Sequence, residues 1–366
     1  MYLIITRTFP PELGGMQMLM WGLTNELAKH EKVKVFAEDY KDAKEHDKNI
    51  NFSIERVAGF KIFRKFRKAN LINEYLKNEH SVTTVIADHW KSLEKIDQSL
   101  LHNKKTLCLI HSKEINHPVG SGLNERVLNT LSKTNFIISN SNFTKKLAIS
   151  LNISPEKIKV INPGVEKYEK PSDENIKISK ELFKNSFPKL ITVSRFDKRK
   201  NHDKVIMTIR NLREIYPNIK YLCIGYGDEE NNLKKLVKEL KLENIIIFKK
   251  NINSNLKSAF LNQSDIFIMP SIIYKKSVEG FGISFMEAAQ QGTASIGGID
   301  GGASDAIKHE ETGLICDGNN LNSIYESILK ILKNDNYKKY GENAKEFSKN
   351  FNWDIIVKQY LKLIKI

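Results

Sequence analysis

Two glutamates that flank a glycine-containing loop are the residues whose types and spacing most clearly suggest chemistry. The segment from Glu279 to Glu287 reads Glu-Gly-Phe-Gly-Ile-Ser-Phe-Met-Glu and follows an apolar run that ends at Pro270. We expect a helix to begin near Gly282 to Ser284, with its unpaired N–H groups facing a phosphate or sugar oxygens. Glu287 would then accept hydrogen bonds from ribose hydroxyls, and Glu279 would bind a hexose or stabilise a charged transition state. A helix with an N-terminal acid is the alternative, but it does not explain two glutamates around a glycine loop.

A second group combines two cations on one loop. Arg195 and Lys200 lie five residues apart in Ser194-Arg-Phe-Asp-Lys-Arg-Lys-Asn201, between an apolar run and a segment with helical apolar spacing. An arginine fork and a lysine ammonium at this spacing could hold a diphosphate. Because the whole chain is basic, a solvated surface loop is an equally good interpretation of these cations.

A pair of glycines stands near the start of the chain, after the first apolar run. Gly14 and Gly15 would let the backbone approach a ligand, and the helix after them would offer N–H groups to a phosphate. Without a complete Gly-x-Gly-x-x-Gly pattern, the pair alone is more typical of an ordinary turn between a strand and a helix.

Short β-branched runs alternate with longer helical patterns along the whole chain and would position these residues. Runs that are apolar on both faces and separated by helix-length segments indicate parallel sheets covered by helices. They lie at Tyr2–Thr6, Val33–Ala37, Val82–Ala87, Thr106–Ile110, Phe136–Ser139, Ile158–Ile161, Leu190–Ser194, Tyr221–Gly225, Ile245–Phe248, Ile266–Pro270 and Ala294–Gly297. Two such series predict two doubly wound α/β domains, joined by the charged, turn-rich stretch between Gly164 and Pro188.

The amino-acid composition limits the binding partners and the cellular compartment to be expected. The 366 residues include 58 Lys and Arg against 43 Asp and Glu, a net charge of +15, which suggests a polyanionic partner such as nucleic acid, anionic lipid or a phosphorylated ligand. No apolar run approaches the roughly 18 residues of a membrane-spanning helix. The three cysteines lie far apart and no His, Asp or Glu cluster has ligand spacing, so we expect no disulfide, no metal and a cytoplasmic location.

Together these motifs resemble the retaining family 4 glycosyltransferases, and the resemblance covers essentially the whole chain. Its most specific part is the Glu-Gly-Phe-Gly motif with Arg195 and Lys200 upstream. The other motifs are the Gly14-Gly15 loop, His111 after its strand, Ile138-Ser-Asn-Ser141, Val160-Ile-Asn-Pro-Gly164, Gly225-Tyr-Gly227 and Glu311-Thr-Gly-Leu314. The resemblance implies the GT-B fold, in which two Rossmann-like doubly wound domains face each other across a cleft.

The resemblance also assigns roles to the two domains. Residues 1–165 would bind the acceptor and residues 187–350 the nucleotide sugar, while a C-terminal helix at 351–366 would cross back to the first domain. In the second domain, Arg195 and Lys200 would hold the diphosphate, Glu287 the ribose and Ile252 the base.

The transferred sugar would be held from both domains. Glu279, with the backbone of Phe281, Gly282 and Ile283, would bind the sugar and the distal phosphate, and His111 would reach the sugar from the first domain. By its chemistry alone, His111 would be an ordinary histidine at a strand end. The family is metal-independent, so the nucleotide sugar is a substrate and no cofactor is expected.

Three positions depart from the family pattern. Ser194 and Asn201 stand where glycine is common, which concerns turn geometry, and Asp305 stands where glutamate is usual.

The segment Phe60-Lys-Ile-Phe-Arg-Lys-Phe-Arg-Lys68 is both basic and aromatic. On a helix, an apolar arc of Ile62, Phe63, Phe66 and Ala69 would oppose a basic arc of Lys61, Arg64, Lys65 and Lys68. The basic arc could lie on an anionic membrane surface, as in related enzymes with lipid acceptors. A surface helix that packs its aromatic side on the first domain is the equal alternative.

These observations predict a retaining transferase that moves a hexose from a nucleotide diphosphate, UDP being favoured, to an acceptor hydroxyl. A membrane lipid such as diacylglycerol is the preferred acceptor, and a lipopolysaccharide or capsular oligosaccharide is the alternative. The enzyme would then work in the cytoplasm, on the inner face of the membrane. A nucleic-acid-binding α/β protein is the remote alternative, since no recognition motif accompanies the basic charge.

Overall fold

The computed structural model describes residues 1–12 and 14–366, with every side chain in those ranges except that of Lys61. The chain divides into two compact units, which we describe one at a time. The first comprises Met1–Glu166 and Asn352–Ile366, and the second comprises Lys167–Phe351.

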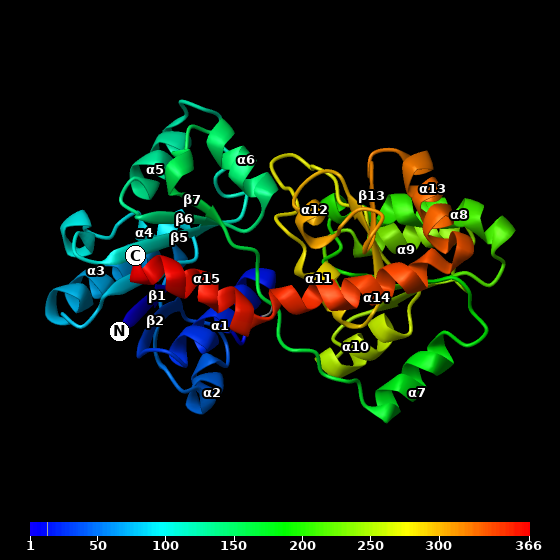
Figure 1. Ribbon diagram of the computed structural model, residues 1–366, viewed down its shortest axis with the longest axis horizontal. Coiled ribbons are helices and arrows are strands. Elements are labelled where there is room, and N and C mark those ends of the chain that lie inside the picture. The colour runs from blue at the N-terminus through cyan, green and yellow to red at the C-terminus, as the bar shows by residue number, and fades with distance from the viewer. Residues whose placement is uncertain (13) are drawn as a thin grey trace. The chain divides into compact units, whose positions relative to one another are not determined.

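The first unit is built on a seven-stranded sheet in the order β3-β2-β1-β4-β5-β6-β7, in which all pairs are parallel (Figure 1). The strands are β1 (Tyr2–Ile5), β2 (Val33–Glu38), β3 (Ser53–Val57), β4 (Thr84–Ala87), β5 (Lys105–Ile110), β6 (Phe136–Ser139) and β7 (Ile158–Val160). The order reverses between β1 and β4, which in doubly wound sheets is the switch point where ligands bind.

Helices cover both faces of this sheet because successive strand residues point to opposite sides. Leu3 and Ile5 pack in one core with α3, α4, α5 and α6, whereas Tyr2 and Ile4 pack in another with α1 and α15. The helices are α1 (Gly15–Ala28), α2 (Ala43–His46), α3 (Lys61–Asn78), α4 (Trp90–Leu93), α5 (Gly122–Leu131), α6 (Asn142–Ser150) and α15 (Trp353–Lys365).

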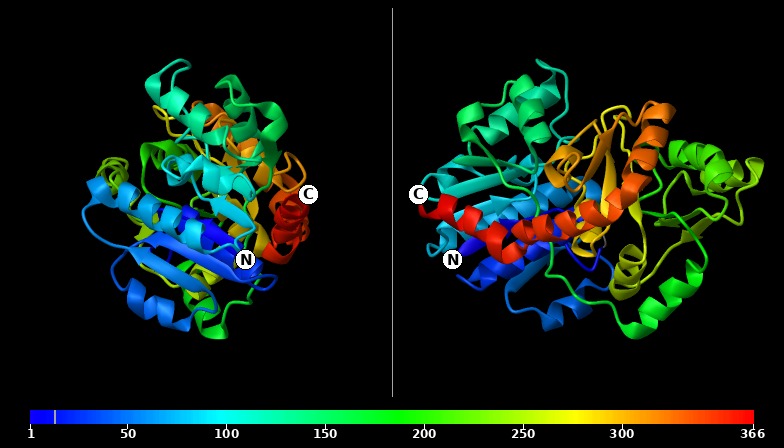
Figure 2. Two further views of the ribbon diagram at one scale, coloured as in Figure 1. Left: turned by 90° about the vertical axis from the view of Figure 1, so that its left-hand side faces the viewer. Right: turned by 45° about the vertical axis from the view of Figure 1, so that its right-hand side comes forward.

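The last helix, α15, completes the first unit from the far end of the chain. It lies along α1, as both views of Figure 2 show. The indole of Trp353 fills the space over two glycines: a Cβ on Gly22 would lie 2.0 Å from its Nε1, and one on Gly164 2.4 Å from its Cδ2. The lack of side chains at Gly22 and Gly164 therefore leaves the space that the indole of Trp353 occupies.

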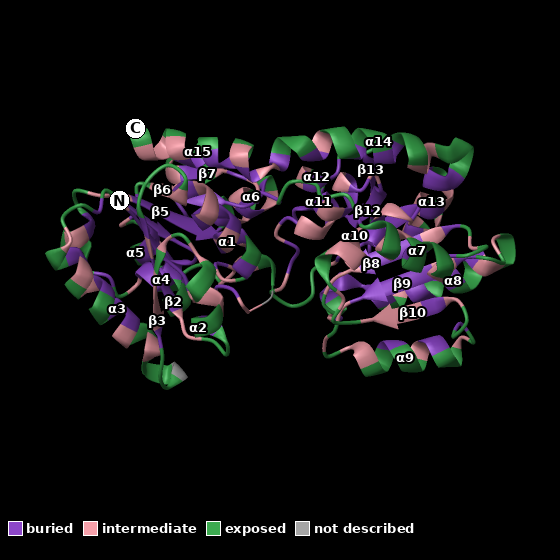
Figure 3. Ribbon diagram, turned by 90° about the horizontal axis from the view of Figure 1, so that it is seen from below, coloured by how far each residue is buried: buried purple, intermediate pink, exposed green. Residues whose placement is uncertain are grey.

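The second unit repeats the architecture with a six-stranded parallel sheet in the order β10-β9-β8-β11-β12-β13. Its strands are β8 (Lys189–Val193), β9 (Lys220–Ile224), β10 (Ile246–Lys249), β11 (Ile266–Met269), β12 (Ala294–Gly298) and β13 (Gly313–Cys316). Its helices are α7 (Asp173–Leu182), α8 (His202–Ile215), α9 (Glu230–Glu239), α10 (Ser254–Asn262), α11 (Ile283–Gln290), α12 (Ala303–Ala306), α13 (Leu321–Leu332) and α14 (Asn336–Ser348). In Figure 3 most of these strands have the purple of buried residues, whereas β10 at the sheet edge is largely half-buried. Here the switch point lies between β8 and β11.

The predicted fold class, two doubly wound α/β domains, is confirmed. Two strands have no counterpart in the predicted series: β3 at the sheet edge, in which only Val57 is buried, and β13, which begins with Gly313 and has only three apolar side chains. Within the stretch expected to connect the domains, α7 packs on α10 of the second unit. The reason is apolar burial, because Phe183 after α7 meets the ring of Phe260 at 6.3 Å.

Among the described helices, none combines the length and the apolar character that crossing a bilayer requires.

Candidate active site

The loop after β8 carries the predicted cations to the switch point of the second unit. A 3-10 turn at Lys198–Lys200 is capped by Asp197, whose Oδ1 accepts from the backbone N–H of Lys200 at 3.2 Å. This cap turns Lys200 inward, where it is buried, while Arg195 remains exposed with Nη2 3.6 Å from Asp197 Oδ2. The two predicted diphosphate ligands thus differ, one pre-positioned and one free to move.

Lys200 meets the glutamate of the neighbouring loop. Its ammonium donates to Glu279 Oε2, and Nη1 of Arg199 donates to the same oxygen at 2.6 Å. All three residues are buried, with at most 8% of each exposed. The cluster unites the loops after β8 and β11, the two strands that flank the switch point.

The charge balance of this cluster determines the ionisation of Glu279. Burial alone would raise the pKa of its carboxyl, but the Lys200 ammonium and the Arg199 guanidinium outweigh burial and lower the pKa from 4.5 to about 2. Burial lowers the pKa of Lys200, and Glu279 offsets part of that effect. Near neutral pH the site therefore holds a carboxylate beside two cations, a net positive charge suited to a diphosphate.

The lowered pKa of Glu279 predicts a pH dependence of stability. A carboxyl whose folded pKa is depressed contributes stability above its unfolded pKa and loses it as the pH falls through the folded value. The free-energy difference in unfolding between wild type and Glu279→Gln should therefore be largest above pH 5 and shrink by roughly 3 kcal/mol toward pH 2. Urea titrations of both proteins across this range measure it, and a difference that stays constant with pH contradicts the assignment.

Backbone contacts fix Glu279 and leave one of its oxygens available. The carbonyl of Glu279 accepts from the N–H of Gly302 at 2.9 Å, and a Cβ on Gly301 would approach that carbonyl to 2.5 Å. Both cations bind Oε2, and within the described parts of the chain no side chain or backbone group is bonded to Oε1. Oε1 can therefore accept a hydroxyl hydrogen bond without breaking the ion pairs.

Helix α11 begins as the glutamate motif predicts. Gly282, at φ 87°, precedes it in the left-handed conformation, and Ile283 is its first residue. Phe281 is buried, whereas Glu287 lies one turn into the helix, half-exposed, with Oε1 2.7 Å from Lys257 Nζ of α10. The first N–H groups of α11 and the Glu287 carboxylate thus belong to the same helix end.

Two glycines and an asparagine shape the loops around the cations. A Cβ on Gly225 would lie 1.9 Å from the carbonyl oxygen of Ser194, and one on Gly227 2.4 Å from that of Phe196, so the loop after β9 needs both glycines. Asn201 has φ 63°, and its amide donates to the carbonyls of Pro270 and Gly318. Asparagine therefore supplies the left-handed conformation that glycine usually provides and adds two hydrogen bonds.

The remaining predicted donor residue in this unit, Ile252, lies between β10 and α10 and is half-buried. Its role against a nucleotide base stays a prediction.

The predicted residues of the first unit lie at the carboxyl ends of its strands. Gly15 is the first residue of α1, Gly14 precedes it, and within the described residues no side chain caps this helix end. His111 follows β5, and its Nε2 lies 2.9 Å from the carbonyl oxygen of Asp88. As His111 and the glycines belong to the first unit and the ionic cluster to the second, their joint action on one sugar stays a prediction.

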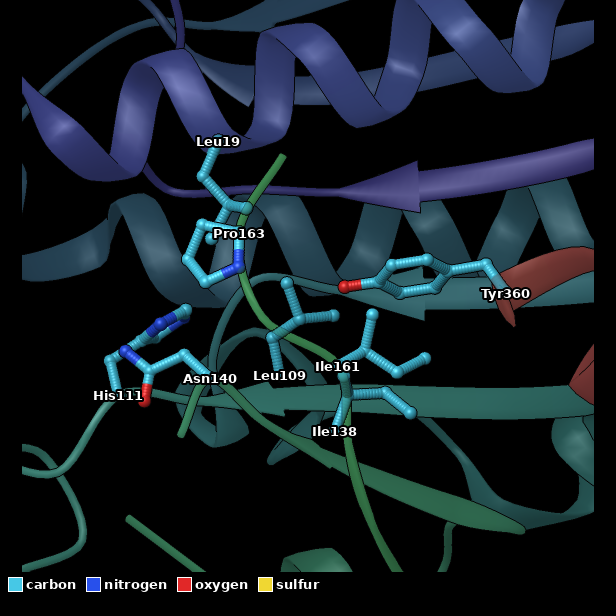
Figure 4. A pocket seen from close by; sticks show the side chains of 8 residues that line it. All are labelled: Leu19, Leu109, His111, Ile138, Asn140, Ile161, Pro163 and Tyr360. Atoms are coloured by element: carbon cyan, nitrogen blue, oxygen red, sulfur yellow. The ribbon is translucent and has the colours of Figure 1, made fainter. Parts of the chain in front are cut away.

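His111 also borders a small pocket (Figure 4). His111 and Asn140 lie at one end of it and Tyr360 of α15 at the other, with the apolar side chains of Leu109, Ile138 and others between them. Burial raises the pKa of Tyr360. The pocket is too narrow for a sugar ring.

The sequence analysis missed Arg199. Its side chain is buried and bonded to Glu279, yet in a loop that reads Lys-Arg-Lys three adjacent cations look alike. The signal available was Asp197, because a capping acid before a short turn sets which of the following residues point inward.

The basic stretch forms a helix, and the alternative interpretation, in which its aromatic side packs on the first domain, is wrong. Phe60, Ile62 and Phe63 are 82%, 78% and 59% exposed, so the aromatic side does not pack on the domain. Lys68 is 3% exposed and donates to the carbonyl of Thr6, so its prediction as a membrane-surface residue is wrong.

The cause is an acid on β2. Glu38 Oε2 lies 3.2 Å from Arg64 Nη1, and Oε1 lies 3.7 Å from Lys68 Nζ, which turns these two cations toward the protein. Lys65 is exposed beside the ring of Phe66, and the side chain of Lys61 lies outside the described residues.

Throughout the described parts of the chain, no three His, Cys, Asp or Glu side chains are grouped as metal ligands would be.

Two doubly wound domains, with a buried cationic cluster at a switch point beside a glycine loop and a helix N-terminus, define the class of nucleotide-sugar glycosyltransferases with the GT-B fold. A family model described as "Glycosyltransferase Family 4" matches residues 13–167, and one described as "Glycosyl transferases group 1" matches residues 173–347. The chain therefore belongs to the family 4 glycosyltransferases.

Relatives match at least 90% of the chain, and a solved structure shares its fold. The chain is similar to an uncharacterized glycosyltransferase of Methanocaldococcus jannaschii, at 25% identity over 97% of this chain and 95% of the relative. It is also similar to the GDP-mannose-dependent alpha-(1-6)-phosphatidylinositol monomannoside mannosyltransferase of Mycolicibacterium smegmatis, at 23% identity over 90% and 88% of the two chains. The structure of Anabaena HepE in complex with UDP shares the fold, with a TM-score of 0.82, 17% identity and coverage of 100% and 99%.

Proposed function

We propose that this glycosyltransferase moves a hexose from a UDP-sugar to a hydroxyl of a membrane lipid, with retention of configuration and without a metal. The observation that carries the donor half is the buried cluster of Lys200, Arg199 and Glu279 at the switch point of the second unit. Two cations and a helix N-terminus supply the charge stabilisation that a departing diphosphate requires.

The reaction balances without a protein base. The bond between the anomeric carbon and the diphosphate oxygen breaks, and the acceptor oxygen bonds to that carbon on the same face. The acceptor proton passes to the leaving phosphate oxygen. Lys200 and Arg195 bind the developing negative charge, while Oε1 of Glu279 accepts a hydrogen bond from a sugar hydroxyl.

GDP-mannose is the second candidate donor, because the Mycolicibacterium relative is named as a GDP-mannose-dependent enzyme. Thermal shifts with UDP, GDP and ADP, followed by their sugars, distinguish the bases. Nuclear magnetic resonance of the product then gives the anomeric configuration. An inverted product, or no shift with any nucleotide diphosphate, contradicts the proposal.

The exposed apolar side chains at the start of α3 support the membrane half of the proposal. Phe60, Ile62, Phe63 and Phe66 are exposed together with the cationic side chain of Lys65. Apolar side chains that enter the lipid boundary beside a cation are typical of an interfacial helix. An oligosaccharide acceptor in solution would not require such a surface.

Glu287→Ala is expected to weaken binding of the nucleoside diphosphate about 10- to 100-fold, because a charged hydrogen-bond acceptor for the ribose is lost. Lys257→Ala is the matched control, since it removes the partner of Glu287 at 2.7 Å and leaves the carboxylate in place. Isothermal titration calorimetry with UDP and GDP measures both variants. Equal affinities of Glu287→Ala and wild type would remove Glu287 from the ribose site.

A further inference from the structure

The switch point of the first unit carries cationic side chains that are not among the predicted donor-binding residues. β1 and β4 pair in the register Ile5 with Ala87, so Arg7 and His89 follow at matching positions, two residues beyond the paired ends. Lys91 comes next along the chain, after Trp90. These residues share the sheet edge on which ligands of doubly wound domains bind.

Arg7 is the central group of this cluster. In the part of the chain that the structure describes, its guanidinium has no hydrogen-bond or ion-pair partner, and its Nε is buried without one. Its positive charge affects the pKa values of three neighbouring side chains. Burial chiefly lowers the pKa of His89, of Lys91 and of Lys68, and the Arg7 guanidinium lowers each of them further.

The carboxylates near Arg7 already accept hydrogen bonds from other groups of the protein. Asp88 accepts from the Thr6 hydroxyl, the Arg7 backbone N–H and the Ser92 hydroxyl. The other carboxylates in this part of the unit are bonded in the same way: Glu38 to Arg64, Glu94 to Arg126 and Glu114 to the backbone N–H of His111. Among the described residues, none of these carboxylates is bonded to the Arg7 guanidinium, so its positive charge is available to an external anion.

His89 is oriented to donate a hydrogen bond. Its Nδ1 accepts from the backbone N–H of Lys91 at 2.9 Å, so the proton of the neutral ring resides on Nε2. Because burial and the surrounding cations lower its pKa well below the ordinary value, the ring stays neutral near pH 7. A neutral N–H donor between a guanidinium and an ammonium is a good set of ligands for phosphate oxygens.

We propose that Arg7, His89 and Lys91 form an anion-binding site that holds a phosphate group of the acceptor. This inference rests on the proposed function and narrows it: the acceptor is a phosphate-bearing lipid rather than neutral diacylglycerol. The donor diphosphate is the other possible source of the same chemistry, and the experiment separates the two.

The test uses the full chain with saturating UDP, or GDP if that nucleotide binds, so that the donor site is filled. sn-Glycerol 3-phosphate is then titrated by calorimetry, with glycerol as the neutral match. This soluble probe avoids any effect of α3 on vesicles. We expect the phosphate to bind and glycerol not to bind. Arg7→Gln should weaken phosphate binding about tenfold or more, and Lys91→Gln, on an exposed side chain, should also weaken it.

Lys77→Gln is the matched control, because it removes one exposed cation from α3 of the same unit and should leave binding unchanged. Equal binding of glycerol and its phosphate, or equal effects of Arg7→Gln and Lys77→Gln, overturns the site. A comparable loss of UDP affinity in Arg7→Gln without the probe would assign the anion to the donor and overturn the acceptor assignment. Failure of the proposed function itself is seen separately, as absence of UDP and GDP binding by wild type.

Discussion

Replacing Lys200 by alanine is expected to reduce sugar transfer about 100- to 1,000-fold, to near background. The ammonium is buried against Glu279 and is the only fixed cation that the predicted diphosphate pair contributes, since Arg195 is exposed. Its loss removes charge stabilisation that is needed most when the diphosphate departs. It also leaves Glu279 with Arg199 alone, so the pKa of the carboxyl should rise.

Lys198→Ala is the control for this prediction. Lys198 lies on the same 3-10 turn, is exposed, and has its ammonium 5.7 Å from the ring centroid of Tyr274. Initial rates with the nucleotide sugar identified by binding, together with thermal unfolding of each variant, separate lost chemistry from lost folding. Wild-type turnover in Lys200→Ala, in a folded protein, would show that the diphosphate is bound elsewhere.

Replacing Phe60, Ile62 and Phe63 together by serine is expected to lower vesicle binding at least about 100-fold. Each of these side chains would leave water on binding, and burying one large apolar side chain contributes roughly 1.5–3 kcal/mol. The measurement is co-sedimentation with vesicles of phosphatidylglycerol and phosphatidylcholine at low and high salt. Because apolar insertion is not screened by ions, most wild-type binding should persist at high salt.

Ile215→Ser is the comparison, since it changes an apolar side chain that is 54% exposed on α8 of the second unit. The triple variant should remain folded, because the α3 residues that build the core are Ala69, Ile72 and Leu76. Unchanged sedimentation of the triple variant, or binding that disappears entirely with salt, would show that charge alone drives any association.

The fold was predictable because central parallel strands are buried on both faces and read as continuous apolar runs. The two strands that the predicted series lacks give no such run: β3 contains Glu55 and Arg56, and β13 begins with Gly313, which leaves only three apolar side chains. Apolar pattern predicts burial well, and it says little about strands held mainly by backbone pairing at an edge.

The donor loops were predictable in part, because their glycines and charges have spacing that few other sites share. The partner of Glu279 was harder to predict, since Arg199 and Lys200 differ only in which way a capped turn points them. The orientation of α3 depends on Glu38, which is distant in sequence and bonds Arg64. A helical wheel separates two arcs, and only tertiary contacts decide which arc faces the protein.

The return of α15 to the first unit has a consequence for biosynthesis. During translation, residues 1–166 emerge long before Trp353, so the space over Gly22 and Gly164 stays unfilled until Trp353 has been synthesised. The second unit, which is continuous in sequence, can close earlier. The first unit can therefore be completed only after the whole of the second unit has been synthesised.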